Sequence, residues 1–258
     1  MINLDLKGKS VLLTGSLGAI SEHIVRRLSE AGAHLVLTDI VSPDKAIAYL
    51  QAWGLSPETW TYFEMDVTDT QAVDAVVERI FEQQPNLDIA LGHAGGCGLH
   101  PFAEAEPDEY KRIFDFNFFG QINFTRSVLK HWTQRQTAGH LLYTSSYVAQ
   151  IPHQGISAYA PAKAALENLI KCLALEYAEH NIRFNAVSPG NVAAGSSLKV
   201  YNEDEQYRTF VQRATPAKRQ NTPESIADAV VFMCSPLAQE INGHVMNVDL
   251  GIKIPKIG

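Results

Sequence analysis

The feature that most constrains the fold of this chain is a regular alternation of short apolar segments with longer segments of helical period. Residues 10–14 and 34–39 are short aliphatic runs, and residues 20–31 between them carry apolar side chains at helical spacing. Residues 11–13 and 35–37 are apolar throughout, without a polar alternation. Strands of this kind are buried on both faces, as in a parallel sheet covered by helices on both sides. The start of the chain therefore predicts a β-α-β unit.

The same alternation continues to the end of the sequence. We predict further strands at 59–65, 88–91, 140–145, 183–188 and 244–248, and helices at 42–54, 69–83, 107–135 (one or two helices), 159–179 and 222–234. The fold class is therefore α/β, a doubly wound parallel sheet of about seven strands with helices on both faces. Such a sheet can hold residues 1–258 as a single domain. Residues 195–220 lose the periodicity and predict a loop or a mobile helix pair, a candidate substrate lid.

Charge and cysteine content exclude several classes of protein. The chain has 21 Lys and Arg residues against 28 Asp and Glu residues, and its formal net charge of -7 opposes binding to nucleic acid or to an anionic membrane. No apolar run approaches the roughly 20 residues of a membrane helix. Cys97, Cys172 and Cys234 form no C-x-x-C pair and suggest no disulfide framework. We therefore expect a soluble cytoplasmic protein with no nucleic-acid or membrane partner.

A glycine-containing turn joins the first predicted strand to the first predicted helix. Its candidate cofactor-binding residues are Gly15, Ser16, Gly18, Ala19 and Ile20. A dinucleotide fold of the Rossmann type places its pyrophosphate here, on the N-terminus of the helix. The alternative is an ordinary turn between a strand and a helix, because glycine is common in such turns. Other residues must decide between the two.

Acidic residues at the ends of two strands fit the nucleotide interpretation. Asp39 ends the second strand, where a carboxylate accepts hydrogen bonds from the hydroxyls of the adenosine ribose. A carboxylate there also opposes the 2′-phosphate of NADP(H), and the next residue is Ile40 rather than a basic residue, so we expect NAD(H) as the cofactor. Asp66 and Val67, after the third strand, are candidates for contact with the adenine. Either carboxylate could instead cap a loop or a helix.

Tyr159 and Lys163 lie four residues apart at the start of the longest predicted helix, so their side chains share one face. A phenol, with a pKa of about 10, is a poor base at neutral pH, but an adjacent ammonium favours the phenolate. Ser146 follows a predicted strand, where its hydroxyl would project from the carboxyl edge of the sheet and could hold a substrate oxygen. A solvated helix face is the alternative for the Tyr-Lys pair alone. Ser, Tyr and Lys in this order are much rarer.

From Lys7 to Gly251 the sequence resembles the short-chain dehydrogenase/reductase family. The most specific segments are Ser145-Ser146, Tyr159-Ala-Pro-Ala-Lys163, Ile182 to Gly190 and Asn247 to Gly251. The resemblance implies an NAD(H)-dependent oxidoreductase that transfers a hydride between the cofactor and a secondary alcohol or ketone. A sugar or another small hydroxylated molecule is one candidate substrate, and the sequence leaves the identity of the substrate open. The resemblance also implies a homodimer or homotetramer. The broad apolar surface of the helix at 159–179 agrees with a second subunit.

The resemblance assigns roles to four catalytic positions. Ser146 orients the substrate, Tyr159 is the general acid/base, Lys163 adjusts Tyr159 and binds the nicotinamide ribose, and Asn117 holds a proton-relay water near Lys163. The further cofactor contacts that it implies are Ala94, Gly95, Pro189, Gly190 and Val192, with the backbone of Val192 on the nicotinamide carboxamide. The histidines show no metal-binding spacing, so we expect no catalytic metal.

The sequence departs from the family pattern at three places, all of which affect cofactor binding. Ala19 and Ser21 replace glycines, Gly92 and His93 replace two asparagines, and Ala194 replaces a threonine. Alanine at 19 predicts a loop that is either strained or re-formed around the neighbouring glycines. A non-catalytic nucleotide-binding or regulatory subunit is therefore the alternative. We favour an active enzyme because all four catalytic positions are filled.

Overall fold

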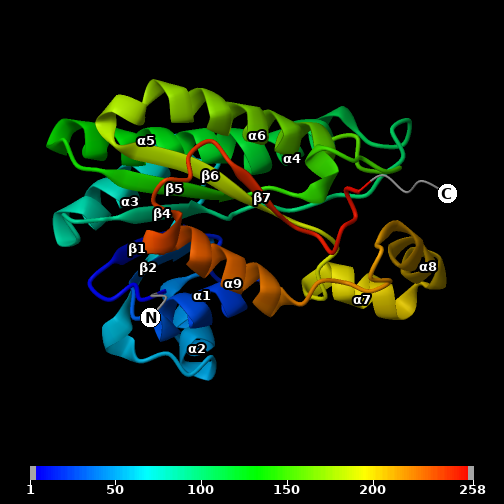
Figure 1. Cartoon of the computed structure of the whole chain (residues 1–258), viewed down its shortest axis with the longest axis horizontal. Helices are drawn as coiled ribbons and strands as arrows, with labels where there is room; N and C mark the ends of the chain where they lie inside the picture. Colours follow the sequence, from blue (N-terminus) through cyan, green and yellow to red (C-terminus); the bar gives the residue numbers. More distant parts are fainter. Residues whose placement is uncertain (1–3, 255–258) are drawn as a thin grey trace.

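The computed structural model describes residues 4–254, which form around one seven-stranded parallel sheet (Figure 1). The strand order is β3-β2-β1-β4-β5-β6-β7. The strands are β1 (Ser10–Thr14), β2 (His34–Asp39), β3 (Trp60–Glu64), β4 (Ile89–Gly92), β5 (Gly139–Thr144), β6 (Ile182–Pro189) and β7 (Val245–Val248). The α-helices are α1 (Ser21–Glu30), α2 (Pro43–Ala52), α3 (Thr70–Gln83), α4 (Pro107–Phe114), α5 (Gly120–Arg135), α6 (Tyr159–Glu176), α7 (Gly195–Glu203), α8 (Glu205–Ala214) and α9 (Pro223–Cys234). The predicted doubly wound α/β fold is confirmed.

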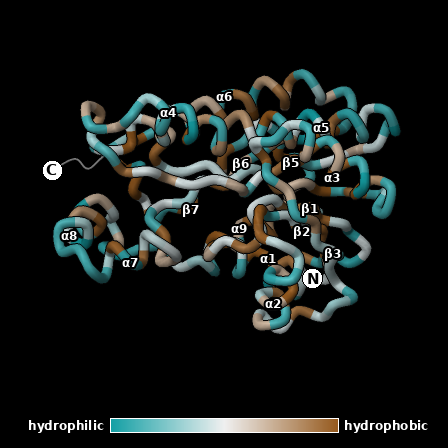
Figure 2. The backbone as a smooth tube through the Cα atoms, turned by 180° about the vertical axis from the view of Figure 1, so that it is seen from behind, coloured by the Kyte–Doolittle hydropathy of each residue, from teal (hydrophilic) through white to brown (hydrophobic). Residues whose placement is uncertain are grey.

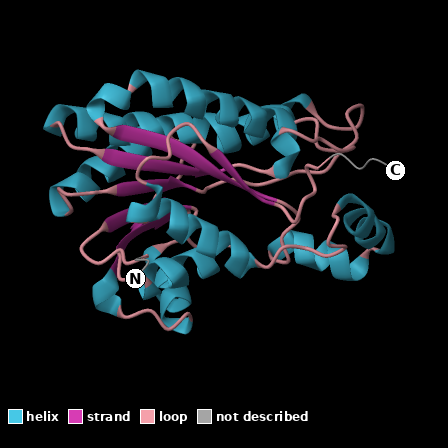
Figure 3. Cartoon of the chain, in the orientation of Figure 1, coloured by secondary structure: helices cyan, strands magenta, loops and turns pink. Residues whose placement is uncertain are grey.

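Helices cover both faces of the sheet, with α1, α2 and α9 on one side and α3, α5 and α6 on the other (Figure 3). The side chains of β1 show why its sequence is apolar throughout. Leu13 packs toward α1 with Ile24, whereas its neighbour Leu12 packs on the opposite face with Phe124 of α5. Figure 2 accordingly shows hydrophobic segments around β1 and β2 and hydrophilic segments at the periphery, including α8.

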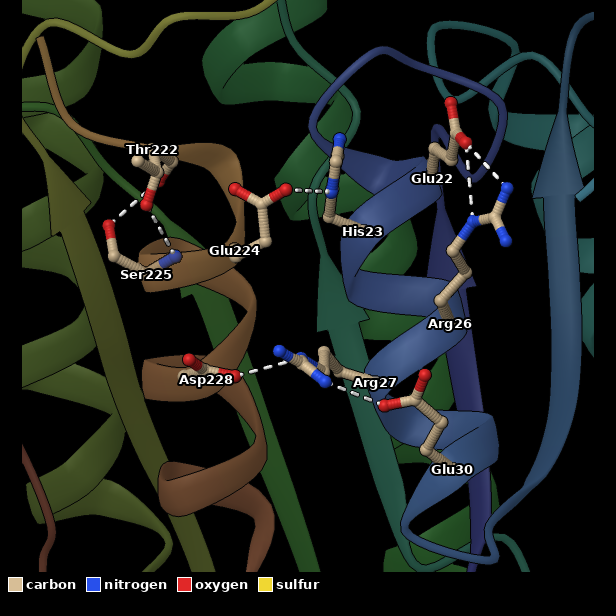
Figure 4. Close-up of polar contacts among 9 residues, drawn as sticks. All are labelled: Glu22, His23, Arg26, Arg27, Glu30, Thr222, Glu224, Ser225 and Asp228. Atoms are coloured by element: carbon tan, nitrogen blue, oxygen red, sulfur yellow. Dashed lines mark hydrogen bonds and ion pairs between the residues drawn. The ribbon is translucent and has the colours of Figure 1, made fainter.

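Ion pairs join α1 to α9 in addition to their apolar contact (Figure 4). His23 Nδ1 lies 3.2 Å from Glu224 Oε1, and Arg27 Nε lies 3.0 Å from Asp228 Oδ1. All four side chains are partly exposed, so each pair contributes little to the free energy of folding. Helix α1 itself begins directly after the glycine turn of the predicted nucleotide site.

The helix predicted at 107–135 is interrupted by a π-helical turn at Asp115–Phe119, which the sequence did not predict. The amide of Gly120 donates to the carbonyl of Asp115, the five-residue spacing of such a turn. The turn interrupts the regular backbone hydrogen bonds that an α-helix would form. The carbonyl of Ile113 accepts a hydrogen bond from the side chain of Asn117, through Nδ2, at 2.9 Å. The side chain of Asn117 is thereby tied to the irregular turn.

Most of residues 195–220 form two helices, α7 and α8, which lie at the carboxyl edge of the sheet (Figure 1). Helix α7 has no buried residue, and Val211 is the buried residue of α8. Few apolar contacts hold the pair down, so local opening costs little free energy. Its function as a substrate lid stays a prediction.

No helix within residues 4–254 is both long and apolar enough to cross a membrane. No three His, Cys, Asp or Glu side chains in the same range come together in a way that could hold a metal ion.

Candidate active site

The four predicted catalytic residues meet at the carboxyl edge of the sheet. Ser146 follows β5, Asn117 lies in the π-helical turn, and Tyr159 and Lys163 lie at the start of α6. Ser146 and Tyr159 line a cavity of about 520 Å³. Gly95 also lines this cavity, and it lies next to Asn117 and Lys163. A Cβ at Gly95 would lie 2.8 Å from Asn117 Oδ1 and 3.3 Å from Lys163 Nζ. The loop after β4 can pass this close only as glycine.

Tyr159 is a protonated phenol at neutral pH. Burial raises its pKa above the ordinary value, nearby Cys97 acts in the same direction, and a hydrogen bond with Ser146 opposes them. Lys163 Nζ lies 5.7 Å from the centre of the Tyr159 ring and donates to the carbonyl of Thr144 at 2.9 Å. The Tyr-Lys spacing predicts a lowered pKa for Tyr159, but burial raises it in the structure, and the spacing carries no information on burial.

The ammonium of Lys163 is held in a desolvated position. Its side chain is 3% exposed, and burial lowers its pKa to about 8. Burial, with the charge of Lys163 as a smaller cause, also lowers the pKa of His93 to about 4. His93 is therefore neutral at physiological pH, and its Nδ1 pairs with Thr144 Oγ1 at 2.7 Å.

The side chain of Asn117 supports the loop that faces Lys163. Asn117 Nδ2 donates to the carbonyl of Gly96 at 2.8 Å, and Asn117 Oδ1 accepts from the amide of Gly96 at 3.2 Å. Asn117 Nδ2 also donates to the carbonyl of Ile113, so both the oxygen and the nitrogen of the side-chain amide have hydrogen-bond partners. Asn117 therefore fixes residues 95–96 against the π-helical turn.

The glycine turn after β1 is unstrained at Ala19. Gly15 has a φ of 65°, and a Cβ there would lie 2.7 Å from the Cα of Ala94, so this position requires glycine. Ala19 is absent from the left-handed non-glycine positions of the described chain. The buried Ser21 hydroxyl, in place of the family's third glycine, donates to the carbonyl of Gly15 at 2.5 Å. The turn has thus formed around Gly15.

Ser16 lies apart from the other residues of this turn. It is fully buried, and its amide donates to the carbonyl of Thr38 at 3.0 Å, which draws it between β1 and β2. Ser16 therefore borders neither the 520 Å³ cavity nor the smaller cavity at the end of β2 that is described next. Gly18, Ala19 and Ile20 do line the 520 Å³ cavity.

A second cavity, of about 170 Å³, lies at the end of β2. It is bordered by Gly15, Gly18, Asp39, Ile40, Met65, Val67, His93, Ala94, Gly95 and Phe116. Asp39 Oδ2 accepts from the amide of Leu17 at 3.0 Å, so the carboxylate sits beside the glycine turn. Apolar walls and one carboxylate suit an adenine ring and its ribose hydroxyls. Asp66 instead accepts two hydrogen bonds from Thr68, both at 2.8 Å, and does not border this cavity.

The larger cavity is also lined by residues at the end of β6 and in the loop that follows it, namely Pro189, Gly190 and Val192. A Cβ at Gly190 would lie 2.7 Å from Asn221 Oδ1 and 2.9 Å from the Cα of Asp249, so the loop packs tightly here. The carbonyl of Val192 accepts from the amide of Ala194 at 2.9 Å and from Gln220 Nε2 at 3.3 Å. The larger cavity is thus bordered by the candidate cofactor residues of both the first turn and this loop.

Gln121 fills the space beside Gly92, a contact that the sequence did not predict. A Cβ at Gly92 would lie 2.2 Å from Gln121 Oε1 and 2.7 Å from a ring carbon of Tyr143. Gln121 Nε2 donates to the carbonyl of Ala94 at 2.6 Å. The glycine makes room for an amide from α5 that holds the same loop. In the sequence, the one indication of a bulky side chain beside position 92 was the glycine at a position where the family has asparagine.

Glu167 is a second residue that the sequence analysis missed. It is buried one helical turn after Lys163, and its carboxylate accepts from Ser145 Oγ at 2.7 Å and from Gln150 Nε2 at 2.8 Å. It ties the segment around Ser146 to the helix that carries Tyr159. The four-residue step from Lys163 was its signal in the sequence.

Comparison with known proteins agrees with this geometry. Residues 15–253 match the family model described as Enoyl-(Acyl carrier protein) reductase. The chain belongs to the short-chain dehydrogenase/reductase family. It is 32% identical to the 2,3-dihydro-2,3-dihydroxybenzoate dehydrogenase of Bacillus subtilis (strain 168), over 95% of this chain and 96% of the relative. It is 28% identical to the 5-keto-D-gluconate 5-reductase of Escherichia coli (strain K12), over 97% of each chain.

Solved structures of this dehydrogenase/reductase family have the same fold. A gluconate 5-dehydrogenase from Burkholderia cenocepacia J2315, in complex with NADP and tartrate, superimposes with a TM-score of 0.91 at 24% identity, covering 98% of each chain. A 3-ketoacyl-(acyl-carrier-protein) reductase from Brucella melitensis, complexed with NADH, gives a TM-score of 0.85 at 26% identity and covers 97% of this chain and 100% of that one. The protein is thus an oxidoreductase of a family that binds a nicotinamide dinucleotide.

Proposed function

We propose that the protein is an NAD(H)-dependent oxidoreductase that interconverts a secondary alcohol and a ketone on a hydroxylated small molecule of the sugar-acid class. The observation that carries this proposal is the convergence of Ser146 and Tyr159 at one cavity bordered by a glycine turn, with Lys163 Nζ 5.7 Å from the centre of the Tyr159 ring. The names of several relatives, such as the 5-keto-D-gluconate 5-reductase, support the substrate class.

Tyr159 carries the proton in this mechanism. In the reductive direction the neutral phenol donates its proton to the carbonyl oxygen, and Ser146 holds the same oxygen by a hydrogen bond. A nicotinamide held by the glycine turn and by the loop after β6 would supply the hydride to the carbonyl carbon, or accept it in the reverse direction. The Lys163 ammonium, charged below a pH of about 8, then favours the phenolate that remains on Tyr159.

The preference for NAD(H) rests on Asp39. A 2′-phosphate beside its carboxylate would place two negative charges close together in a partly desolvated cavity. At about 4 Å and an effective dielectric near 20, such a contact costs about 4 kcal/mol. Since structural relatives are described with NADP as well as with NADH, the two cofactors must be compared directly.

One screen tests the function. Purified protein is mixed with NADH or NADPH and 5-keto-D-gluconate, and with NAD or NADP and the matching alcohols, while the absorbance of the reduced nicotinamide is followed. We expect turnover with NAD(H), and none with the Tyr159→Phe variant. Binding of NADH, measured as a rise in melting temperature, without turnover of any alcohol or ketone would favour the non-catalytic alternative.

The assembly proposed for this enzyme is a homodimer or homotetramer. Helices α5 and α6 leave between them a groove of about 370 Å³ with Leu129, Leu169 and Leu173 on its walls. A second copy of the chain would cover this apolar surface. Light scattering of the purified protein measures its mass and tests the proposal. The cytoplasmic location stays a prediction.

A further inference from the structure

The 520 Å³ cavity has a group of hydroxyl and amide side chains on the side that faces α7 and α8. Tyr147, Asn191, Ser197 and Tyr207 border the same cavity as Ser146 and Tyr159. Tyr147 directly follows Ser146, Asn191 comes from the loop after β6, and Ser197 and Tyr207 are carried by α7 and α8. Polar groups from four segments therefore lie around the space next to Ser146 and Tyr159.

We propose that Tyr207, acting with Asn191, selects substrates that carry at least one hydroxyl group in addition to the reacting oxygen. The inference rests on the proposed function, because it concerns the substrate of the same site. It assigns to the lid helix α8 the recognition of a polyhydroxylated substrate.

The hydrogen bonds of this group all run toward Asn191. Gln220 Nε2 donates to Ser197 Oγ at 2.9 Å, and Ser197 Oγ lies 3.2 Å from the hydroxyl of Tyr207. Tyr207 and Tyr147 then donate to Asn191 Oδ1 at 3.4 Å and 3.3 Å. The chain of donors orients both phenols from the lid and from the catalytic loop toward one amide.

The bonds to Asn191 leave hydrogen-bonding capacity for a ligand. An ordinary O–H···O bond is about 2.7 to 2.8 Å long, so the two phenol bonds are weak and can be exchanged for shorter ones. Within residues 4–254, Asn191 Nδ2 is buried and has no hydrogen-bond partner. A buried donor left unpaired is costly, so an oxygen that reaches it on a small shift of α8 binds favourably.

A hydroxyl group fits this arrangement better than an apolar substituent. A hydroxyl both donates and accepts, so it can accept from Asn191 Nδ2 or Tyr207 and donate to a phenol oxygen. An apolar group in the same place would desolvate the phenols and the amide without replacing their bonds. Sites that hydrogen-bond a substrate hydroxyl reject analogues that lack it for this reason.

The experiment compares two keto acids that differ in their hydroxyl groups. Reduction of 5-keto-D-gluconate and of 5-oxohexanoate, the same carbon chain with its ketone and carboxylate but no hydroxyl group, is measured with NADH. For the wild-type protein we expect a higher kcat/KM with 5-keto-D-gluconate. For Tyr207→Phe, which removes only the phenol oxygen, we expect the ratio of the two kcat/KM values to fall about 10-fold.

Tyr201→Phe is the matched control, because Tyr201 lies on α7 but does not border the cavity. It should keep the wild-type ratio. An unchanged ratio in Tyr207→Phe, or a wild-type ratio near one, would overturn the inference while leaving the oxidoreductase function intact. Turnover of neither keto acid by the wild-type protein would contradict the sugar-acid substrate itself, and the inference would fall with it.

Discussion

Replacement of Lys163 by methionine should stabilise the fold while it abolishes activity. Burial lowers the pKa of Lys163 from 10.5 to about 8. At pH values below 8, where Lys163 is charged, this difference corresponds to a loss of about 3 kcal/mol in the free energy of unfolding. Methionine removes that loss but also the hydrogen bond to the carbonyl of Thr144, worth about 2 kcal/mol for a charged donor. The net gain is about 1 kcal/mol, or about 2–4 °C in Tm for a chain of this size.

The pH dependence of this gain tests its cause. The folded-state pKa of Lys163 lies below the unfolded one, so the wild-type protein gains stability relative to the variant as pH rises from about 8 to 10.5. Melting curves of both proteins without cofactor, at pH 7 and at pH 10, should therefore show the advantage of Lys163→Met at pH 7 and its loss or reversal at pH 10. A Tm difference that does not change with pH would refute the desolvation argument.

Four further substitutions separate the parts of the site. Tyr159→Phe should lower kcat about 100- to 10,000-fold and keep NADH affinity in a fluorescence titration, because it removes only the acid/base oxygen; a variant with most of its rate would exclude Tyr159 as the proton carrier. Asp39→Asn should narrow the preference for NAD(H) over NADP(H) in kcat/KM at least 10-fold, since it removes the opposing charge; an unchanged preference would place the carboxylate away from the ribose. Gly92→Ala should destabilise the fold by about 1–3 kcal/mol in urea unfolding, because its Cβ would meet Gln121 Oε1 at 2.2 Å, and wild-type stability would show that the amide moves aside freely. Ala19→Gly should leave NADH affinity unchanged or weaker, as Ala19 is not in the left-handed region; tighter binding would reveal strain in the turn.

The arrangement of the sheet could be predicted because a strand buried on both faces leaves a clear trace in the sequence. Residues 11–13 are apolar on both sides, since Leu12 and Leu13 point to opposite layers of helices. The helix predicted at 69–83 begins at Thr70, because the side chain of Asp69 caps it through the amides of Gln71 and Ala72. The helix predicted at 159–179 ends at Glu176, and a separate 3-10 turn follows.

The candidate site could be predicted where its residues are set by short spacing, as Tyr159 and Lys163 are. Properties that depend on distant parts of the chain could not. The pKa of Tyr159 depends on burial by several segments, and the space at Gly92 depends on an amide from α5. The cluster around Asn191 depends on where helices α7 and α8 pack against the rest of the chain. Each of these needs tertiary contacts that no local pattern encodes.

Because of the π-helical turn, the geometry of the candidate active site also depends on the number of residues in this segment. One residue advances an α-helix by about 100° around its axis, so deleting a residue from this turn would rotate α5 by that angle relative to α4. Asn117, which reaches Gly96, and Gln121, which reaches Ala94, could then no longer both face the loop after β4. A shortened turn would make a more regular helix and a disassembled site. The number of residues from Ile113 to Gln121 is therefore as important to the geometry of the candidate site as the chemistry of the side chains among them.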